Sequence, residues 1–137
     1  MIKTILILLS LSTLSLSAFS APVVISNLSG VDQLSDSDVK KLFLGKLKQL
    51  PNGTEPIVIE YADGTPIRIE FHEKVTNKSE SQLQAYWAKL VFTGKANPPK
   101  TVASSAAAIA EVSQNAAAIG YIDSSEVTDQ VKVVYTP

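Results

Sequence analysis

The sequence predicts an α/β domain in which a mixed sheet is flanked by helices. Short runs rich in β-branched residues lie between longer segments that show helical periodicity. The helical segments begin at serine or threonine and end near glycine or asparagine, which are the residues that favour helix starts and stops. Because helices separate most of the strands, we expect a partly parallel sheet with helices packed on its faces. Residues 21–137 are enough for one core, so a single domain is predicted.

The first twenty residues have the pattern of a secretory signal peptide. Lys3 supplies the positive end, residues 5–16 form a short apolar stretch, and small residues precede a cut after Ser20 or Ala21. A cut after Ser20 is preferred, because a cut after Ala21 would place Phe19 where signal peptidases favour a small residue. We therefore expect an exported, periplasmic protein with no membrane span after processing, in which residues 21–137 form the domain.

Composition excludes several classes of site. There is no cysteine, so disulfides, a thiol nucleophile and thiolate metal sites are excluded. The formal net charge is −1 and becomes −2 once Lys3 is removed, and the lysines are scattered rather than gathered into a long basic run. We therefore expect no nucleic-acid partner. An exported protein without cysteine fits a bacterial periplasm better than a eukaryotic exterior.

The secondary structure follows from local patterns. Strands are expected at 22–26, 56–61, 118–122 and 131–135, where β-branched residues cluster. Helix starts are expected at Ser35, at Thr65 followed by Pro66, at the Ser79–Gln82 capping box, and at Ser104 or Ser105. The helix after Ser79 has the clearest apolar stripe, so Trp87 is expected to be buried against the sheet.

The segment from Asp63 to Glu73, DGTPIRIEFHE, contains the only arginine and the only histidine of the chain. A turn leads from a strand into a helix there, and Arg68 lies in the first helical turn. A helix start presents free N–H groups and the positive end of the helix dipole, which suits an anion. A first-turn arginine is expected to contribute little to the core.

Three stretches resemble one family when taken in order: LSDSDVKKLFLGK (34–46), RIEFHEKV with YWAKLVFTGKANPP (68–75 and 86–99), and NAAAIGYID (115–123). Together they resemble the phosphate-binding component of bacterial ABC importers, within the periplasmic binding protein superfamily. Those proteins hold the anion between two lobes, and this chain is long enough for about one. The resemblance therefore implies a single lobe of the periplasmic-binding-protein type, with phosphate or a similar small anion as ligand and an ABC transporter or another periplasmic protein as partner.

The resemblance also implies where an anion would bind. In that family, backbone N–H groups, hydroxyls and an arginine at a helix start hold the ligand. The matching positions here are Asp63, Gly64, Thr65 and Arg68, with Tyr121 on a strand end as a further candidate. Pro66 removes one donor. The alternative is structural: Asp63 pairs with Arg68, Thr65 caps the helix, and nothing binds.

Other chemistry finds less support in the sequence. No nucleophile is paired with a base, so an enzyme is not expected. His72 stands without a second histidine, so it is expected at the surface rather than in a metal site, and no cofactor is predicted. Two functions remain open: a periplasmic binding protein with an anion site at Thr65–Arg68, or a protein–protein interaction module that reuses the lobe and has no small ligand.

Overall fold

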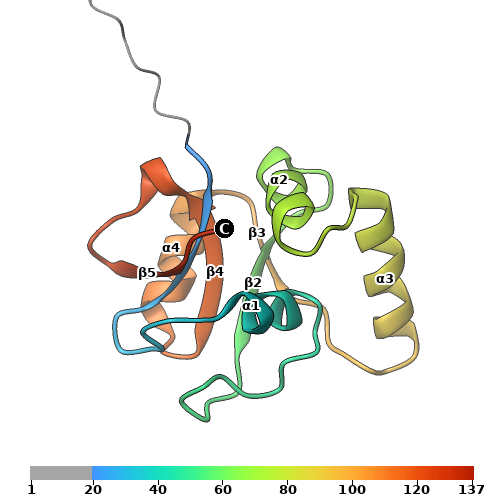
Figure 1. Cartoon of the computed structure of the whole chain (residues 1–137), viewed down its shortest axis with the longest axis horizontal. Helices are drawn as coiled ribbons and strands as arrows, with labels where there is room; N and C mark the ends of the chain where they lie inside the picture. The colour runs from blue at the N-terminus through green and yellow to red at the C-terminus, as the bar shows by residue number, and fades with distance from the viewer. Residues whose placement is uncertain (1–19) are drawn as a thin grey trace, which may run out of the picture.

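The computed structural model describes residues 20–137, so the expected signal peptide lies outside the described residues apart from Ser20. One five-stranded sheet, in the order β3-β2-β4-β1-β5, organises the fold (Figure 1). The strands are β1 (Pro22–Asn27), β2 (Ile57–Tyr61), β3 (Lys100–Val102), β4 (Ala118–Asp123) and β5 (Val131–Tyr135). The helices are α1 (Asp36–Phe43), α2 (Pro66–Val75), α3 (Glu80–Phe92) and α4 (Ser105–Gln114), with a short 3₁₀ helix η1 (Ser124–Glu126).

The sheet is mixed, as the sequence predicts. β2 runs parallel to both β3 and β4, whereas β1 is antiparallel to β4 and β5. β3 was not expected, because residues 97–99 are dominated by prolines and the strand that follows is only three residues long. Such a short edge strand carries almost no periodic signal.

Helices cover both faces of the sheet. Tyr121 on β4 contacts the rings of Phe43 from α1 and Phe71 from α2 on one face. Gly120, the preceding residue, points to the other face, where a Cβ would lie 3.5 Å from Val112 of α4 and 3.2 Å from Ile59 of β2. Glycine at this position therefore lets the side chains of Ile59 and Val112 pack close to β4. The centre of the sheet is buried between α1 and α2 on one side and α4 on the other.

Most of the predicted helix ends are confirmed. Ser35, Ser79 and Ser104 each accept a hydrogen bond from a backbone N–H in the first turn, and the Ser79–Gln82 capping box is complete. Gly45 follows α1 with φ +69°, a conformation that glycine adopts without strain. Thr65 differs: its hydroxyl donates to the carbonyl of Ala62 at 2.9 Å and makes no capping bond to α2.

The position of α3 corrects the sequence-based expectation. This helix lies at one side of the molecule beside α2, away from the sheet (Figure 1), and Leu83 is its only buried residue. Phe92 is 91% exposed. Trp87 is half-buried and packs its ring over Gly45 instead of entering the core. The apolar stripe of α3 is therefore largely uncovered in this chain.

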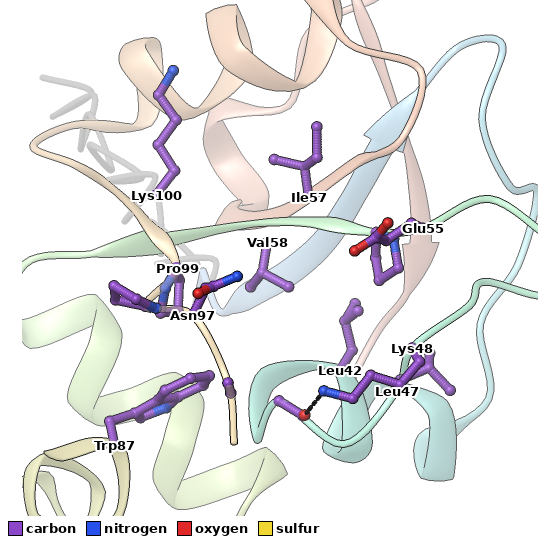
Figure 2. Close-up of a pocket in the computed structure, with 14 residues that line it drawn as sticks. Leu42, Leu47, Lys48, Glu55, Ile57, Val58, Trp87, Asn97, Pro99 and Lys100 are labelled. Carbon is purple, nitrogen blue, oxygen red and sulfur yellow. Dashed lines mark hydrogen bonds between the residues drawn. The ribbon is translucent and has the colours of Figure 1, made fainter. Parts of the chain in front are cut away.

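A groove separates α3 from the body of the domain. Its volume is about 390 Å³, and Figure 2 shows Trp87 on one wall and Leu42, Leu47 and Val58 around the opposite side. Lys48 also lines the groove and donates to the carbonyl of Gly45 at 3.3 Å. The groove lies at the amino-terminal end of β2, whereas the turn from Asp63 to Arg68 follows the carboxyl end of the same strand.

Candidate anion-binding site

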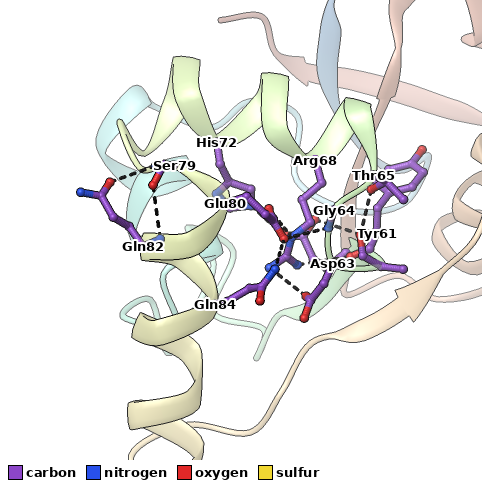
Figure 3. Close-up of polar contacts among 12 residues, drawn as sticks. Tyr61, Asp63, Gly64, Thr65, Arg68, His72, Ser79, Glu80, Gln82 and Gln84 are labelled. Carbon is purple, nitrogen blue, oxygen red and sulfur yellow. Dashed lines mark hydrogen bonds and ion pairs between the residues drawn. The ribbon is translucent and has the colours of Figure 1, made fainter.

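The candidate turn connects the buried end of β2 to the start of α2. Gly64 has φ +79°, so it supplies the left-handed conformation that the turn needs. Thr65 is extended, and Pro66 occupies the first position of α2. The backbone N–H of Gly64 consequently points toward the start of α3 rather than into the sheet (Figure 3).

Arg68 is 5% exposed, which the sequence did not predict for a first-turn arginine. Its guanidinium binds partners in three directions. Nε donates to both carboxylate oxygens of Glu80 at 3.1 Å, Nη1 donates to the carbonyl of Tyr61 at 3.2 Å, and Nη2 pairs with Asp63 at 3.1 Å. The arginine therefore ties the end of β2, the turn and the first residue of α3 together.

The carboxylate of Glu80 binds the turn at Gly64 and Arg68, two of the residues that the sequence proposes for an anion. One of its oxygens, Oε1, accepts from the N–H of Gly64 at 2.8 Å, from Nε of Arg68 at 3.1 Å and from the side-chain amide of Gln84 at 3.1 Å (Figure 3). Sequence reasoning missed Glu80, because an acidic residue in the first turn of a helix is ordinarily explained by the helix dipole. No local signal shows that α3 begins beside the start of α2.

The environment of Glu80 favours its charged form. Partial burial raises the pKa of Glu80, but hydrogen bonds from Gln84, Gly64 and Arg68, together with the charge of Arg68, outweigh burial and hold the pKa below its usual range. The turn therefore stabilises a carboxylate anion at this position.

The two remaining candidates, Asp63 and Tyr121, differ in their surroundings. Asp63 makes the predicted ion pair with Arg68, and its side chain is 67% exposed. Tyr121 is fully buried, stacks on Phe71 with ring centroids 3.8 Å apart, and donates its hydroxyl to Glu60 rather than to the turn. Burial, followed by the charge of Glu60, raises the pKa of Tyr121 well above its ordinary value. The structure thus brings Asp63, Gly64 and Arg68 together and leaves Tyr121 in the core.

A buried polar network lies next to the turn. Glu60 and His72 are 2% and 1% exposed, and Oε2 of Glu60 lies 2.8 Å from Nε2 of His72. The other oxygen, Oε1, accepts from the N–H of Tyr61 at 2.9 Å and from Tyr121. His72 is therefore a core residue, and the expectation of a surface histidine is wrong. The available signal was its position three residues before the apolar Val75, which places both side chains on one side of α2.

Within residues 20–137, no three side chains of histidine, aspartate or glutamate gather as a metal site would require. Across the same residues, no helix has both the length and the apolar content needed to cross a membrane.

Comparison with known proteins identifies the fold. No protein-family model matches the sequence, and none of the curated proteins compared with it matches either. Solved structures do match. An ABC-type phosphate transport receptor from Vibrio cholerae superposes with a TM-score of 0.67 at 15% identity, covering 84% of this chain and 45% of that one.

Two further structures give the same result. A Clostridium perfringens protein assigned as a phosphate ABC transporter substrate-binding protein, solved with bound phosphate, has a TM-score of 0.66 at 24% identity and 84% and 44% coverage of the two chains. PstS from Borrelia burgdorferi has a TM-score of 0.66 at 12% identity, with 84% and 46% coverage. This chain thus spans less than half the length of each of these three proteins. Its fold is the one expected from the sequence: an α/β lobe of the kind found in the substrate-binding proteins of phosphate ABC transporters.

Proposed function

We propose that this chain is a periplasmic binding-protein-like lobe that binds a small anion, such as phosphate or a carboxylate, at the turn formed by Gly64 and Arg68. The observation that carries the proposal is the carboxylate of Glu80, which the turn already holds. The N–H of Gly64 and Nε of Arg68 converge on one oxygen atom at 2.8 and 3.1 Å. Donors that converge in this way can hold the oxygen of any anion that takes the place of Glu80.

The affinity is expected to be modest. A single lobe leaves the ligand open to solvent, Pro66 removes one donor, and an incoming anion must first displace Glu80. A dissociation constant between about 1 mM and the high micromolar range corresponds to roughly 4–6 kcal/mol. Binding is expected to weaken with salt, because counter-ions screen the attraction between the incoming anion and the charge of Arg68.

Nuclear magnetic resonance offers a direct test, because Arg68 is the only arginine and gives one Nε–H signal. Phosphate or acetate titrated into the processed protein should shift the signals of the Arg68 Nε–H and the Gly64 amide together, with one dissociation constant. Shifts confined to the lysines between Lys40 and Lys48 would reveal non-specific binding to surface charge. Unchanged signals from Gly64 and Arg68 at tens of millimolar anion would contradict the proposal.

The periplasmic location is part of the same proposal, and it rests on the sequence of the first twenty residues and on the fold of the rest. Mass spectrometry of the exported protein should find an N-terminus at Ala21 or Pro22 in the soluble periplasmic fraction. An intact Met1, or retention on membranes after a salt wash, would argue against export by signal-peptide cleavage.

A second candidate function, a protein–protein interaction module, is favoured by the uncovered side of α3. Val91 and Phe92 are 43% and 91% exposed, and they follow the half-buried Trp87 on the same helix. Exposed apolar clusters of this kind often mark protein contacts. If α3 is a docking surface, Phe92→Asp should abolish binding of a periplasmic partner while leaving the anion-dependent shifts at Gly64 and Arg68 unchanged. A partner that binds Phe92→Asp as well as the unaltered protein would exclude this surface.

A further inference from the structure

We infer that Glu80 determines the specificity of the turn: its carboxylate is a built-in competitor, and the anion that replaces it best is another monocarboxylate rather than phosphate. This inference rests on the proposed anion-binding function and names the ligand class of that site. It follows from three properties of the site, namely the number of donors that hold Glu80, the surrounding charge and the attachment of Glu80 to a helix.

The available donors match a carboxylate. Nε of Arg68 lies 3.1 Å from both oxygens of Glu80, and the Gly64 N–H adds a bond of 2.8 Å to one of them. The outer nitrogens of Arg68 already bind the carbonyl of Tyr61 and the carboxylate of Asp63. Pro66, the first residue of α2, has no N–H to offer. A phosphate in this place would present more oxygen atoms than the two donors that hold Glu80 can bind, and desolvated oxygens without donors reduce affinity.

The charge around the site also favours a monocarboxylate over phosphate. Asp63 lies 3.1 Å from Arg68, and a cavity of about 130 Å³ beside the guanidinium is also lined by Glu60 and Asp63. In Glu80→Ala, one bound monoanion restores the charge that the Glu80 carboxylate contributes in the unaltered protein. A phosphate dianion would add negative charge next to Asp63, and like charges held close together in a partly buried site repel each other.

Glu80 is held in position by its own helix. It is the first residue of α3, which begins with the complete capping box of Ser79 and Gln82, and Gln84 one turn later donates to Glu80 at 3.1 Å. A tethered carboxylate has a high effective concentration at the turn. The apparent affinity for an external anion is therefore reduced by the fraction of time that the turn is free of Glu80.

The test compares Glu80→Ala and Glu80→Gln with the unaltered protein, titrated at pH 7 with acetate, phosphate and chloride at matched ionic strength. The readout is the single Arg68 Nε–H signal together with the Gly64 amide. Glu73→Gln is the matched control, because Glu73 is an exposed carboxylate on α2 and its substitution makes the same change in net charge. Thermal melting of each variant checks that the fold persists. Glu80→Gln can still accept from Gly64 through its amide oxygen, so it covers the case in which Glu80→Ala fails to fold.

If Glu80 occupies the turn for 90% of the time or more, Glu80→Ala should bind acetate at least about tenfold more tightly than the unaltered protein. Glu80→Gln should change affinity in the same direction by a smaller factor, and Glu73→Gln should match the unaltered protein. In Glu80→Ala, acetate should bind more tightly than phosphate, and chloride should bind least.

Each of the other possible results contradicts a different part of the inference or of the proposed function. Equal acetate affinity in Glu80→Ala and the unaltered protein would show that Glu80 is no competitor, while the proposed anion site would stand. Tighter binding of phosphate than of acetate in Glu80→Ala would refute the carboxylate class alone. Absence of binding at Gly64 and Arg68 in every variant would remove the proposed function itself.

Discussion

The carboxylate of Glu60 and the imidazole of His72 lie 2.8 Å apart in the core of the domain, and a proton must lie between them. The hydroxyl of Thr76 donates to the carbonyl of His72 at 3.0 Å, so it can only accept from Nδ1 of the ring, also at 3.0 Å. Nδ1 therefore carries a hydrogen. The contact between Nε2 and Glu60 needs a second one, held by either partner, and the pair is neutral as a whole in both cases.

This proton count predicts that Glu60→Gln is tolerated. The glutamine oxygen can accept from Tyr61 and Tyr121, and its amide can donate to Nε2 of a neutral His72. We expect Glu60→Gln to cost less than about 1.5 kcal/mol of unfolding free energy. Glu60→Ala should cost about 3–5 kcal/mol, because it leaves buried partners without a hydrogen bond. Urea denaturation at pH 7 measures both, and equal costs for the two variants would contradict the proton assignment.

Arg68 is predicted to be essential for stability, contrary to the sequence-based expectation that a first-turn arginine adds little. Arg68→Ala leaves the carbonyl of Tyr61 and the carboxylate of Glu80 without their donor, so we expect a loss of about 3 kcal/mol or more. Arg68→Lys should recover only part of it, since an ammonium cannot reproduce the forked donors. Thermal melts that place Arg68→Ala within about a degree of the unaltered protein would refute this role.

Substituting alanine at Gly45 and at Gly94 distinguishes the cost of backbone strain from the cost of a steric clash. Their φ angles are nearly equal, +69° and +68°, but a Cβ at Gly45 would lie 2.9 Å from the ring of Trp87, whereas nothing lies within 4 Å at Gly94. Gly94→Ala should cost about 1–2 kcal/mol from the left-handed backbone alone. Gly45→Ala should cost more and should alter the tryptophan fluorescence. Equal costs and an unchanged emission spectrum would show that Trp87 moves aside freely.

Alkaline pH is predicted to destabilise the protein through its tyrosines. The hydrogen bond to Asp36, followed by burial, raises the pKa of Tyr135 to about 12, and burial raises the pKa values of Tyr61, Tyr86 and Tyr121. Because the folded state holds these groups neutral, the stability they contribute is present below the unfolded value of about 10 and is lost as the pH rises above it.

Denaturant midpoints should therefore fall from about pH 10 upward, where unfolded tyrosines begin to ionise. As the pH is raised, the ultraviolet absorbance of tyrosinate should appear at higher pH in the folded protein than in the urea-unfolded chain. Tyr135→Phe serves as the control, and it should lose part of this difference. Coincident titration of the folded and unfolded protein would contradict the raised pKa values.

The fold class followed from local sequence patterns, because strands, helix caps and glycine stops each depend on neighbouring residues. Ser35, the Ser79–Gln82 capping box and Gly45 lie where their chemistry predicts. The resemblance to phosphate-binding proteins also extended correctly to the fold. Local patterns did not predict β3, which is only three residues long. They also did not predict that α3 is uncovered, because an apolar stripe shows which face of a helix is apolar and not what that face packs against.

The candidate site likewise has some features that the sequence predicts and others that it does not. Local sequence was enough to identify the turn, its glycine and its only arginine, and it gave the pairing of Asp63 with Arg68 as one of two alternatives. Long-range packing was needed to show that Arg68 is buried, that His72 hydrogen-bonds to Glu60, and that Glu80 binds the turn. The physical reason is that each of these depends on how α2 and α3 are placed against the end of β2. That placement is set by packing between residues distant in sequence, and no local propensity encodes it.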